Sequence, residues 1–258
     1  MASGFGDLAA VVVGGTAGIG LASAEALLAA GLARLVISGR SAERGTAARN
    51  RLAEQFPDAK ISFLSCDASR PEEAKGMIAE AVSWTGGIDI LVSTAGGDPR
   101  PRLLHQIPLE DVMPTIEMAS AGIILPARAV LDHMRERGRG SVICFASDAS
   151  KVATPGESVI GAAMAAITMF CRGMAIEAKR NGVRVNCITP SIVQGTPLYY
   201  RLQEDEFCRK LFGKAETMAS LGVATAEDLA ALVVFLASPG SARITGQTIS
   251  VTGGISAV

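Results

Sequence analysis

The sequence predicts an α/β protein whose core is a doubly wound parallel sheet of about seven strands. Short runs rich in β-branched residues alternate along the chain with Ala- and Leu-rich stretches of helical length. Strands that are regularly separated by helices pair in parallel through right-handed crossovers. The chain has 258 residues, which is enough to bury a core of this size without disulfides or a metal.

The expected strands and helices follow one another in a regular order. LAAVVVGG leads into a helix over 18–30, ARLVISG into 42–55, ISFLSCD into 71–84, IDILVSTAG into 109–137 and GSVICFAS into 157–180, before the strand VRVNCITP. Each strand is a short apolar run, whereas each helix is longer and more polar on one side. Residues 196–219 are less regular and follow the sixth strand, where an open α/β sheet places a substrate lid. No repeat or linker interrupts the order, so we expect one domain, 1–258, with this lid.

Charge and hydropathy exclude several classes of partner. The chain carries 24 Lys and Arg against 25 Asp and Glu, a balance that offers no electrostatic footprint for nucleic acid or an anionic membrane. Its apolar runs are shorter than the roughly 18 residues that span a bilayer, and no basic residue precedes the first of them as in a secretory signal. The cysteines are scattered, which favours reduced core residues over a metal site. We expect a cytoplasmic protein that binds a small molecule and no metal.

A glycine-rich segment lies at the first junction between strand and helix. Val13-Gly14-Gly15-Thr16-Ala17-Gly18-Ile19-Gly20 follows a strand and opens a helix, which is the context of a nucleotide-binding loop. Gly14 permits the tight turn, Gly18 lets a pyrophosphate approach the helix N-terminus, and Gly20 lets the helix pack on the sheet. Glycine patterns also occur in ordinary turns, but this placement favours a dinucleotide site.

The spacing G-x-x-x-G-I-G resembles that of the classical short-chain dehydrogenase/reductase family. Further segments agree with this family: Cys66-Asp67, Ser93-Thr94-Ala95-Gly96, Arg184-Val185-Asn186, Pro190-Ser191, Phe235-Leu236-Ala237-Ser238, Ile244-Thr245-Gly246-Gln247 and Val251-Thr252-Gly253-Gly254. The resemblance covers the whole chain and implies a Rossmann-type fold that binds a nicotinamide dinucleotide. The cofactor-binding residues expected on this basis are Gly14, Thr16, Gly18, Ile19, Gly20, Arg40, Ser41, Asp67, Ala68, Ala95, Gly96, Pro190, Ile192 and Thr196.

Arg40 favours NADP(H) over NAD(H) as the cofactor. It follows the second expected strand directly. An acidic residue at this place takes the ribose hydroxyls of NAD, whereas Arg pairs with a 2′-phosphate. Ala17 does not supply the second basic residue that often accompanies such an Arg, and a solvated loop Arg is the alternative interpretation.

The resemblance implies a catalytic set of Asn, Ser, Tyr and Lys, and three of the four are replaced. Ser147 falls on the serine, which in the family hydrogen-bonds the substrate carbonyl. Ile160 falls on the tyrosine, Met164 on the lysine and Ala119 on the asparagine. A Tyr and a Lys spaced i, i+4 share one helical face, where the Lys lowers the pKa of the phenol and the Tyr transfers the proton. Ile and Met do neither, so we expect ordinary carbonyl reduction to be severely impaired.

Other polar residues near the expected site are candidates for the missing proton donor. Tyr199 and Tyr200 are the only tyrosines of the chain and lie in the expected lid, and together with Ser147 they are the catalytic candidates. Further candidates are Asp148, Ser150, Lys151 and Glu157 between Ser147 and Ile160, His105 in the loop after TAGG, and Arg100 and Arg102 as ligands of an anionic substrate group. Solvation or packing is the alternative interpretation for each of them.

Three functions remain open from the sequence. The first is an NAD(P)-dependent oxidoreductase of this family that acts on a small carbonyl, alcohol or enone by a non-standard proton route. The second is an inactive dinucleotide-binding protein with a regulatory or assembly role, and the third is a non-redox lyase or isomerase. Hydride transfer separates the first from the others, and the prevalent class of the family favours it. Helix 157–180 carries more small and apolar surface than one sheet face needs, and the family commonly associates through it, so we also expect a homo-oligomer, a tetramer or a dimer.

Overall fold

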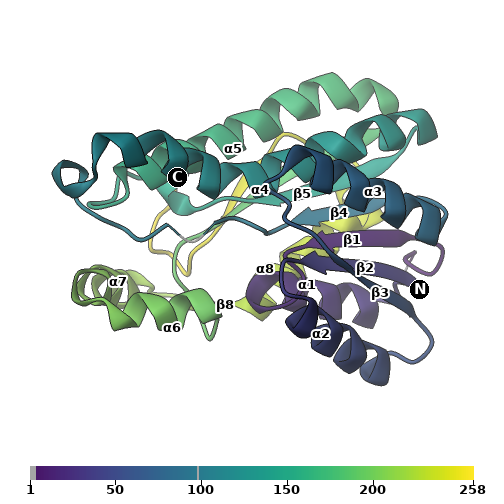
Figure 1. The fold of residues 1–258 in the computed structure, drawn as a ribbon, viewed down its shortest axis with the longest axis horizontal. Helices are drawn as coiled ribbons and strands as arrows, with labels where there is room; N and C mark the ends of the chain where they lie inside the picture. Colours follow the sequence, from purple (N-terminus) through teal and green to yellow (C-terminus); the bar gives the residue numbers. More distant parts are fainter. Residues whose placement is uncertain (1–3, 98) are drawn as a thin grey trace.

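The computed structural model describes residues 4–97 and 99–258, and a seven-stranded sheet forms its centre (Figure 1). The strands are β1 (Ala9–Val13), β2 (Arg34–Gly39), β3 (Lys60–Ser65), β4 (Ile90–Ser93), β5 (Gly140–Phe145), β6 (Val183–Pro190) and β9 (Thr248–Val251). Their order in the sheet is β3-β2-β1-β4-β5-β6-β9, and every neighbouring pair is parallel. The predicted doubly wound parallel sheet is therefore confirmed.

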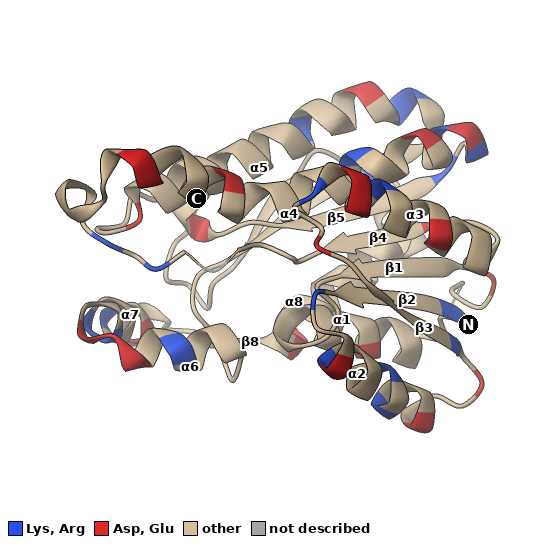
Figure 2. Cartoon of the chain, viewed as in Figure 1, with Lys and Arg blue, Asp and Glu red and all other residues tan. Residues whose placement is uncertain are grey.

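Six helices cover the two faces of this sheet. On one face lie α1 (Gly18–Ala29), α2 (Ala42–Gln55) and α8 (Ala226–Ala237), and on the other lie α3 (Pro71–Thr85), α4 (Leu109–Arg137) and α5 (Ser158–Ala178) (Figure 1). Charged side chains lie along these helices, whereas the strands carry very few of them (Figure 2). A parallel sheet that is covered on both faces needs strands that are apolar on both sides.

The core divides into two clusters because side chains alternate across each strand. Val11 and Val13 of β1 pack in the cluster that α3, α4 and α5 complete, whereas Ala10 and Val12 pack in the cluster of α1, α2 and α8. All five cysteines are free and buried. The two clusters fix the sheet between its helical layers and so fix where the strand ends lie.

The segment expected as an irregular lid is helical in most of its length. It forms α6 (Pro197–Glu204) and α7 (Glu206–Met218), which stand beyond the carboxyl edge of the sheet (Figure 1). Thr196 caps α6 by accepting the amide of Tyr199 at 3.2 Å, and Asp205 caps α7 by accepting the amide of Cys208 at 2.8 Å. Side-chain caps of this kind satisfy backbone amides in the first turn of a short helix, and the sequence analysis did not use these two capping residues as signals.

Elements that were not expected follow β6 and precede the last strand. A small ladder of β7 (Val193–Gln194) and β8 (Ala224–Thr225) follows β6, and α8 begins directly after it. Thr225 and Asp228 form a capping box at the start of α8, a signal that the sequence analysis did not use. The other helices begin and end within about two residues of their predicted positions.

One apolar helix needs an explanation. Among the described residues, the stretch Ser158–Asn181 has the length and composition of a membrane-spanning helix, with a mean hydropathy of 1.8. Half of it is buried inside the protein, and Ile167, Cys171 and Met174 belong to the core cluster next to β5 and β6. Packing on the sheet accounts for its buried side.

Candidate functional site

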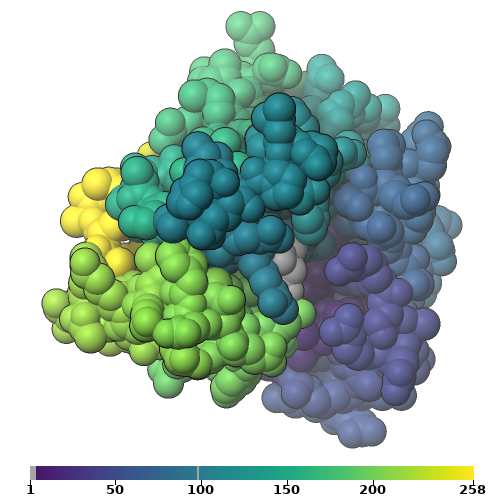
Figure 3. All heavy atoms as spheres, turned by 60° about the vertical axis from the view of Figure 1, so that its left-hand side comes forward, coloured from purple at the N-terminus to yellow at the C-terminus, as the bar shows by residue number. Residues whose placement is uncertain are grey.

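A cavity of about 1060 Å³ lies at the carboxyl ends of β1, β4, β5 and β6. Its walls come from the loops after these strands, from the start of α5 and from the α6–α7 pair. In Figure 3 the green atoms of the α6–α7 pair and the teal atoms of the β4–α4 region border a hollow in which purple N-terminal atoms are visible. Because β1 leads to a helix on one face and β4 to a helix on the other, the loops after these two strands diverge and leave a crevice.

The glycine loop borders this cavity where α1 begins. Gly14 has a φ of 80°, a backbone conformation that side-chain-bearing residues rarely adopt. A Cβ on Gly20 would overlap the carbonyl oxygen of Gly14, so α1 approaches β1 more closely than any other residue allows. Ala17 makes no side-chain cap on the first turn, and Gly18 and Ile19 line the cavity. The amides of this turn are therefore placed to bind an anion.

Two arginines lie at the end of β2. Arg40 lines the cavity directly after the strand, and Arg44, one turn into α2, lines it as well. Ser41, which was expected to bind the cofactor, lies outside the lining and caps α2 by accepting the amide of Arg44 at 3.3 Å. The sequence analysis missed Arg44, although a second basic residue one helical turn after Arg40 was a usable signal.

Asp67 follows β3 and lines the same end of the cavity. Its Oδ1 accepts the hydroxyl of Ser69 at 2.6 Å and the amide of Ser69 at 3.1 Å. These hydrogen bonds, and after them the charges of Arg40 and Arg70, lower the pKa of the Asp67 carboxyl. The carboxylate is thus held ionised, with a fixed orientation, as an acceptor next to the two cavity arginines.

The residues present fit a dinucleotide. The other expected cofactor residues that line the cavity are Thr16, Ala68, Ala95, Gly96, Pro190, Ile192 and Thr196. The start of α1 would hold the pyrophosphate, the ends of β2 and β3 would hold the adenosine half, and the loop after β6 would border the other half. When bound, the nicotinamide supplies or accepts a hydride.

The positions expected for catalysis converge on the same cavity. Ser147, at the end of β5, lines it together with Ala119 of α4 and with Ile160 and Met164 of α5. Ile160 is buried, and Met164 packs against the core. The Ser147 hydroxyl accepts the amide of Ala149 at 3.2 Å and keeps its own O–H to donate. The end of β5 therefore offers the Ser147 hydroxyl as a donor, whereas the α5 wall offers the apolar side chains of Ile160 and Met164.

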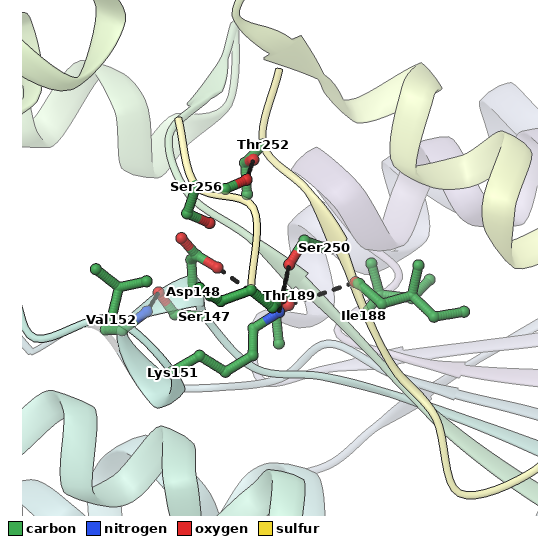
Figure 4. A network of polar contacts seen from close by, with 12 residues as sticks. Ser147, Asp148, Lys151, Val152, Ile188, Thr189, Ser250, Thr252 and Ser256 are labelled. Carbon is green, nitrogen blue, oxygen red and sulfur yellow. Dashed lines mark hydrogen bonds and ion pairs between the residues drawn. The ribbon is translucent and has the colours of Figure 1, made fainter. Parts of the chain in front are cut away.

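Asp148 belongs to a polar network beside Ser147 (Figure 4). It lies in the short helix η2 (Asp148–Ser150), lines the cavity and is buried. Its Oδ1 lies 3.8 Å from the Nζ of Lys151, which also donates to the Ser250 hydroxyl and, at 3.0 Å, to the carbonyl oxygen of Val258. Lys151 itself lies outside the cavity lining. Its ammonium thus faces Asp148 and the C-terminal segment.

The two tyrosines have different positions. Tyr199 lines the cavity, whereas Tyr200 is 62% exposed and lies outside the lining. Their rings pack edge to face with centroids 5.5 Å apart. A hydrogen bond with Glu216 of α7 is the main cause that raises the pKa of the Tyr199 phenol. Only the first of these two candidates therefore borders the site, and its phenol is tied to the neighbouring helix.

The remaining candidates divide in the same way. Glu157 lines the cavity, whereas Ser150, His105, Arg100 and Arg102 do not. The Ser150 hydroxyl is buried, and His105 is exposed in the short helix η1 (Leu104–Gln106). Proximity in sequence did not separate these residues, because their positions relative to the cavity follow from the tertiary fold.

Comparison with known proteins identifies the family. A family model described as Enoyl-(Acyl carrier protein) reductase matches residues 14–256. The short-chain reductase protein NovJ of Streptomyces niveus is 34% identical over 254 residues, which cover 95% of this chain and 92% of NovJ. The chain belongs to the short-chain dehydrogenase/reductase family.

Solved structures of the family superpose closely on this chain. Levodione reductase has a TM-score of 0.90 at 26% identity, over 97% of this chain and 98% of that one. A short-chain oxidoreductase from Pseudomonas aeruginosa PAO1 has a TM-score of 0.89 at 29% identity, over 98% of both chains. The latter is described as NADPH-bound and as containing an atypical catalytic centre.

The close approach at Gly20 leads to the first testable prediction. Gly20→Ala should lower both the melting temperature and the affinity for NADPH, because its Cβ would push the first turn of α1 away from Gly14. Thermal melts with and without NADPH measure both effects. The matched control is Gly76→Ala in α3, where a Cβ meets no atom within 4 Å. This substitution should stabilise the helix by roughly 0.5–1 kcal/mol. A Gly20→Ala protein that binds NADPH like the native chain would contradict the assignment of this loop.

Proposed function

We propose that this protein is an NADP(H)-preferring oxidoreductase that interconverts a small carbonyl or enone with its reduced product. The observation that carries the proposal is that the dinucleotide-binding groups and Ser147 border one cavity. A hydride acceptor bound beside the nicotinamide would therefore have the Ser147 hydroxyl as a hydrogen-bond donor. In this function the α6–α7 pair acts as the substrate lid, since it forms the wall opposite the strand ends.

The two cavity arginines support the preference for NADP(H). Arg40 and Arg44 come from the end of β2 and the first turn of α2, where the adenosine ribose of a dinucleotide is bound in this fold. Guanidinium groups pair with a phosphate through two parallel hydrogen bonds, which a ribose hydroxyl does not match. The Pseudomonas relative is described as NADPH-bound, which agrees with this choice.

In our proposal, the proton of this reaction does not come from a Tyr-x-x-x-Lys pair. Ile160 and Met164 border the cavity at the helical spacing i, i+4, and neither side chain can hold a proton. Loss of general acid–base help costs roughly 10²–10⁴ in rate. Reduction of ordinary ketones is therefore slow here unless another cavity residue supplies the proton.

The apolar α5 wall also favours a second candidate function. A protein that binds the dinucleotide without turning it over, in a regulatory or assembly role, needs the glycine loop and the arginines but no proton donor. A non-redox lyase or isomerase in the same cavity is the third candidate. Hydride transfer to a substrate distinguishes the first function from both of these.

We also propose that the protein acts in the cytoplasm as a homo-oligomer, a tetramer or a dimer. Met169 and Ile176 leave apolar side chains of α5 exposed, with exposed fractions of 63% and 64%, and Met113 of α4 is 67% exposed. Apolar side chains on two neighbouring helices are typical of a surface that a second copy covers. Light scattering that finds a monomer at micromolar concentration would contradict this assembly.

Arg40→Asp tests the cofactor preference. The change replaces a phosphate partner by a repulsive charge, so the affinity for NADPH should fall by roughly ten- to hundredfold while the affinity for NADH stays the same or rises. Fluorescence titration with both cofactors measures this, and Arg49→Asp on the exposed side of α2 is the matched control. Equal affinities of the native protein for both cofactors would remove the role of Arg40.

Restoring the missing groups tests the assignment of the α5 wall. Ile160→Tyr with Met164→Lys, and with Ala119→Asn in a second variant, should raise the rate of ketone reduction by NADPH, because a phenol of lowered pKa then borders the cavity. Ile160→Phe with Met164→Leu is the control of similar volume. The readout is NADPH consumption in variants whose NADPH affinity is intact. A control that gains as much activity as the restored pair would refute the assignment.

A further inference from the structure

Glu157 stands at the cavity end of α5, one turn before Ile160. It is the N-cap residue of the helix, and its carbonyl oxygen accepts the amide of Gly161 at 2.5 Å. Glu157 and Ile160 therefore belong to the same turn, and both line the cavity together with Ser147. A carboxyl group thus borders the site next to the position where the resemblance would place a phenol.

The surroundings of this carboxyl favour its protonated form. Burial is the largest cause that raises the pKa of Glu157, the hydrogen bond with Thr154 opposes it, and the nearby Asp148 carboxylate raises the pKa further. The ammonium of Lys151 is engaged by Asp148, Ser250 and Val258. The Lys151 ammonium is thus directed at Asp148.

Groups from other elements complete these surroundings. Asp148 approaches Glu157 from η2, and the Cys208 thiol approaches from α7, where burial, Asp205 and Glu157 contribute to raising the pKa of that thiol to about 11. The thiol is therefore neutral next to Glu157. Two cationic residues of the α6–α7 pair, Arg201 and Lys214, also line this cavity.

We propose that Glu157 is the proton donor of this active site, with its carboxyl O–H directed at the substrate carbonyl oxygen that Ser147 also hydrogen-bonds. This inference rests on the proposed function. It explains the two apolar residues on α5, because Ile160 and Met164 border the cavity next to Glu157 without adding a cation that would ionise the carboxyl. An ammonium at position 164 would lower the pKa of a neighbouring acid. That change helps a phenol to release its proton, but it would ionise a carboxyl that has to stay protonated until it donates.

The step balances without a further reactant. The carbonyl carbon accepts the hydride from the reduced nicotinamide as the C=O π bond breaks, and the carbonyl oxygen takes the proton of the Glu157 carboxyl to form the alcohol. A reduced nicotinamide bound in this cavity would supply the two electrons that the carbonyl gains. Water then returns a proton to the Glu157 carboxylate, and in the direction of alcohol oxidation the carboxylate accepts the proton.

The kinetic test compares the native protein with Glu157→Gln and Glu157→Asp. In Glu157→Gln, kcat/KM for reduction should fall by roughly 10²–10⁴ with NADPH affinity unchanged, and Glu157→Asp should retain more activity than Glu157→Gln. Native kcat/KM should also decrease as the pH rises through the raised pKa of Glu157, and this decrease should be absent in Glu157→Gln. Glu177→Gln, on the exposed side of the same helix, is the matched control.

A second readout needs neither substrate nor turnover. Infrared difference titration of the cofactor-free protein should show a carboxylic acid band that persists above the usual pKa range of Glu and is missing in Glu157→Gln. Absence of this band, or a Glu157→Gln protein with native kcat/KM and pH profile, would overturn the inference and leave the proposed function in place. A native protein that binds NADPH but transfers no hydride would overturn both.

Discussion

The site depends on one constraint of the parallel sheet, which is that its two faces are closed by helices. The apolar side chains of the central strands are occupied by packing, as in β1, where Val11 and Val12 belong to opposite core clusters. Polar chemistry is therefore confined to the edge at which the strands end. The crevice opens between β1 and β4 because their crossovers leave on opposite faces. At this point Thr94 locks the two strands by donating its hydroxyl to the carbonyl oxygen of Val13 at 2.8 Å.

The two halves of the cavity have different chemical character. The half near α1 and α2 offers helix amides, two guanidinium groups and the ionised Asp67, all of which suit a phosphorylated dinucleotide. The half near α5 combines the Ser147 hydroxyl with Ile160, Met164 and a carboxyl of raised pKa at Glu157. The first half matches the family closely. The second half carries apolar side chains at Ile160 and Met164, where the resemblance implies a Tyr and a Lys.

The sequence predicted those parts of the site that follow from local patterns. The parallel sheet followed from the alternation of strands and helices, Gly14 and Gly20 followed from the glycine pattern at the junction of β1 and α1, and Arg40 followed from its place after β2. Ser41 was expected to bind the cofactor, and its role as a cap of α2 was not expected because it depends on side-chain geometry. Arg44 was missed because the expected second cation was sought in the glycine loop at Ala17.

The lid shows a further limit of sequence reasoning. The two tyrosines are adjacent in sequence, but α6 presents Tyr199 to the cavity and Tyr200 to the outside. Glu157 was one of several polar residues between Ser147 and Ile160, and no local pattern ranked it above Asp148 or Lys151. Its place at the N-terminus of α5, one turn before Ile160 and in the cavity lining, distinguishes it, and this place is a consequence of tertiary packing.

The central claim is that a hydride is transferred in a cavity whose α5 wall carries no Tyr-Lys pair. The most direct measurement is a single turnover with NADPH that carries deuterium at the transferred position, with the product analysed by mass spectrometry and NMR across a panel of ketones and enones. The account predicts a product with one deuterium on the carbon that accepted the hydride, formed by the native protein and formed at a slower rate by Ser147→Ala. Bound NADPH that stays unconsumed, or a product that contains no deuterium, would contradict it.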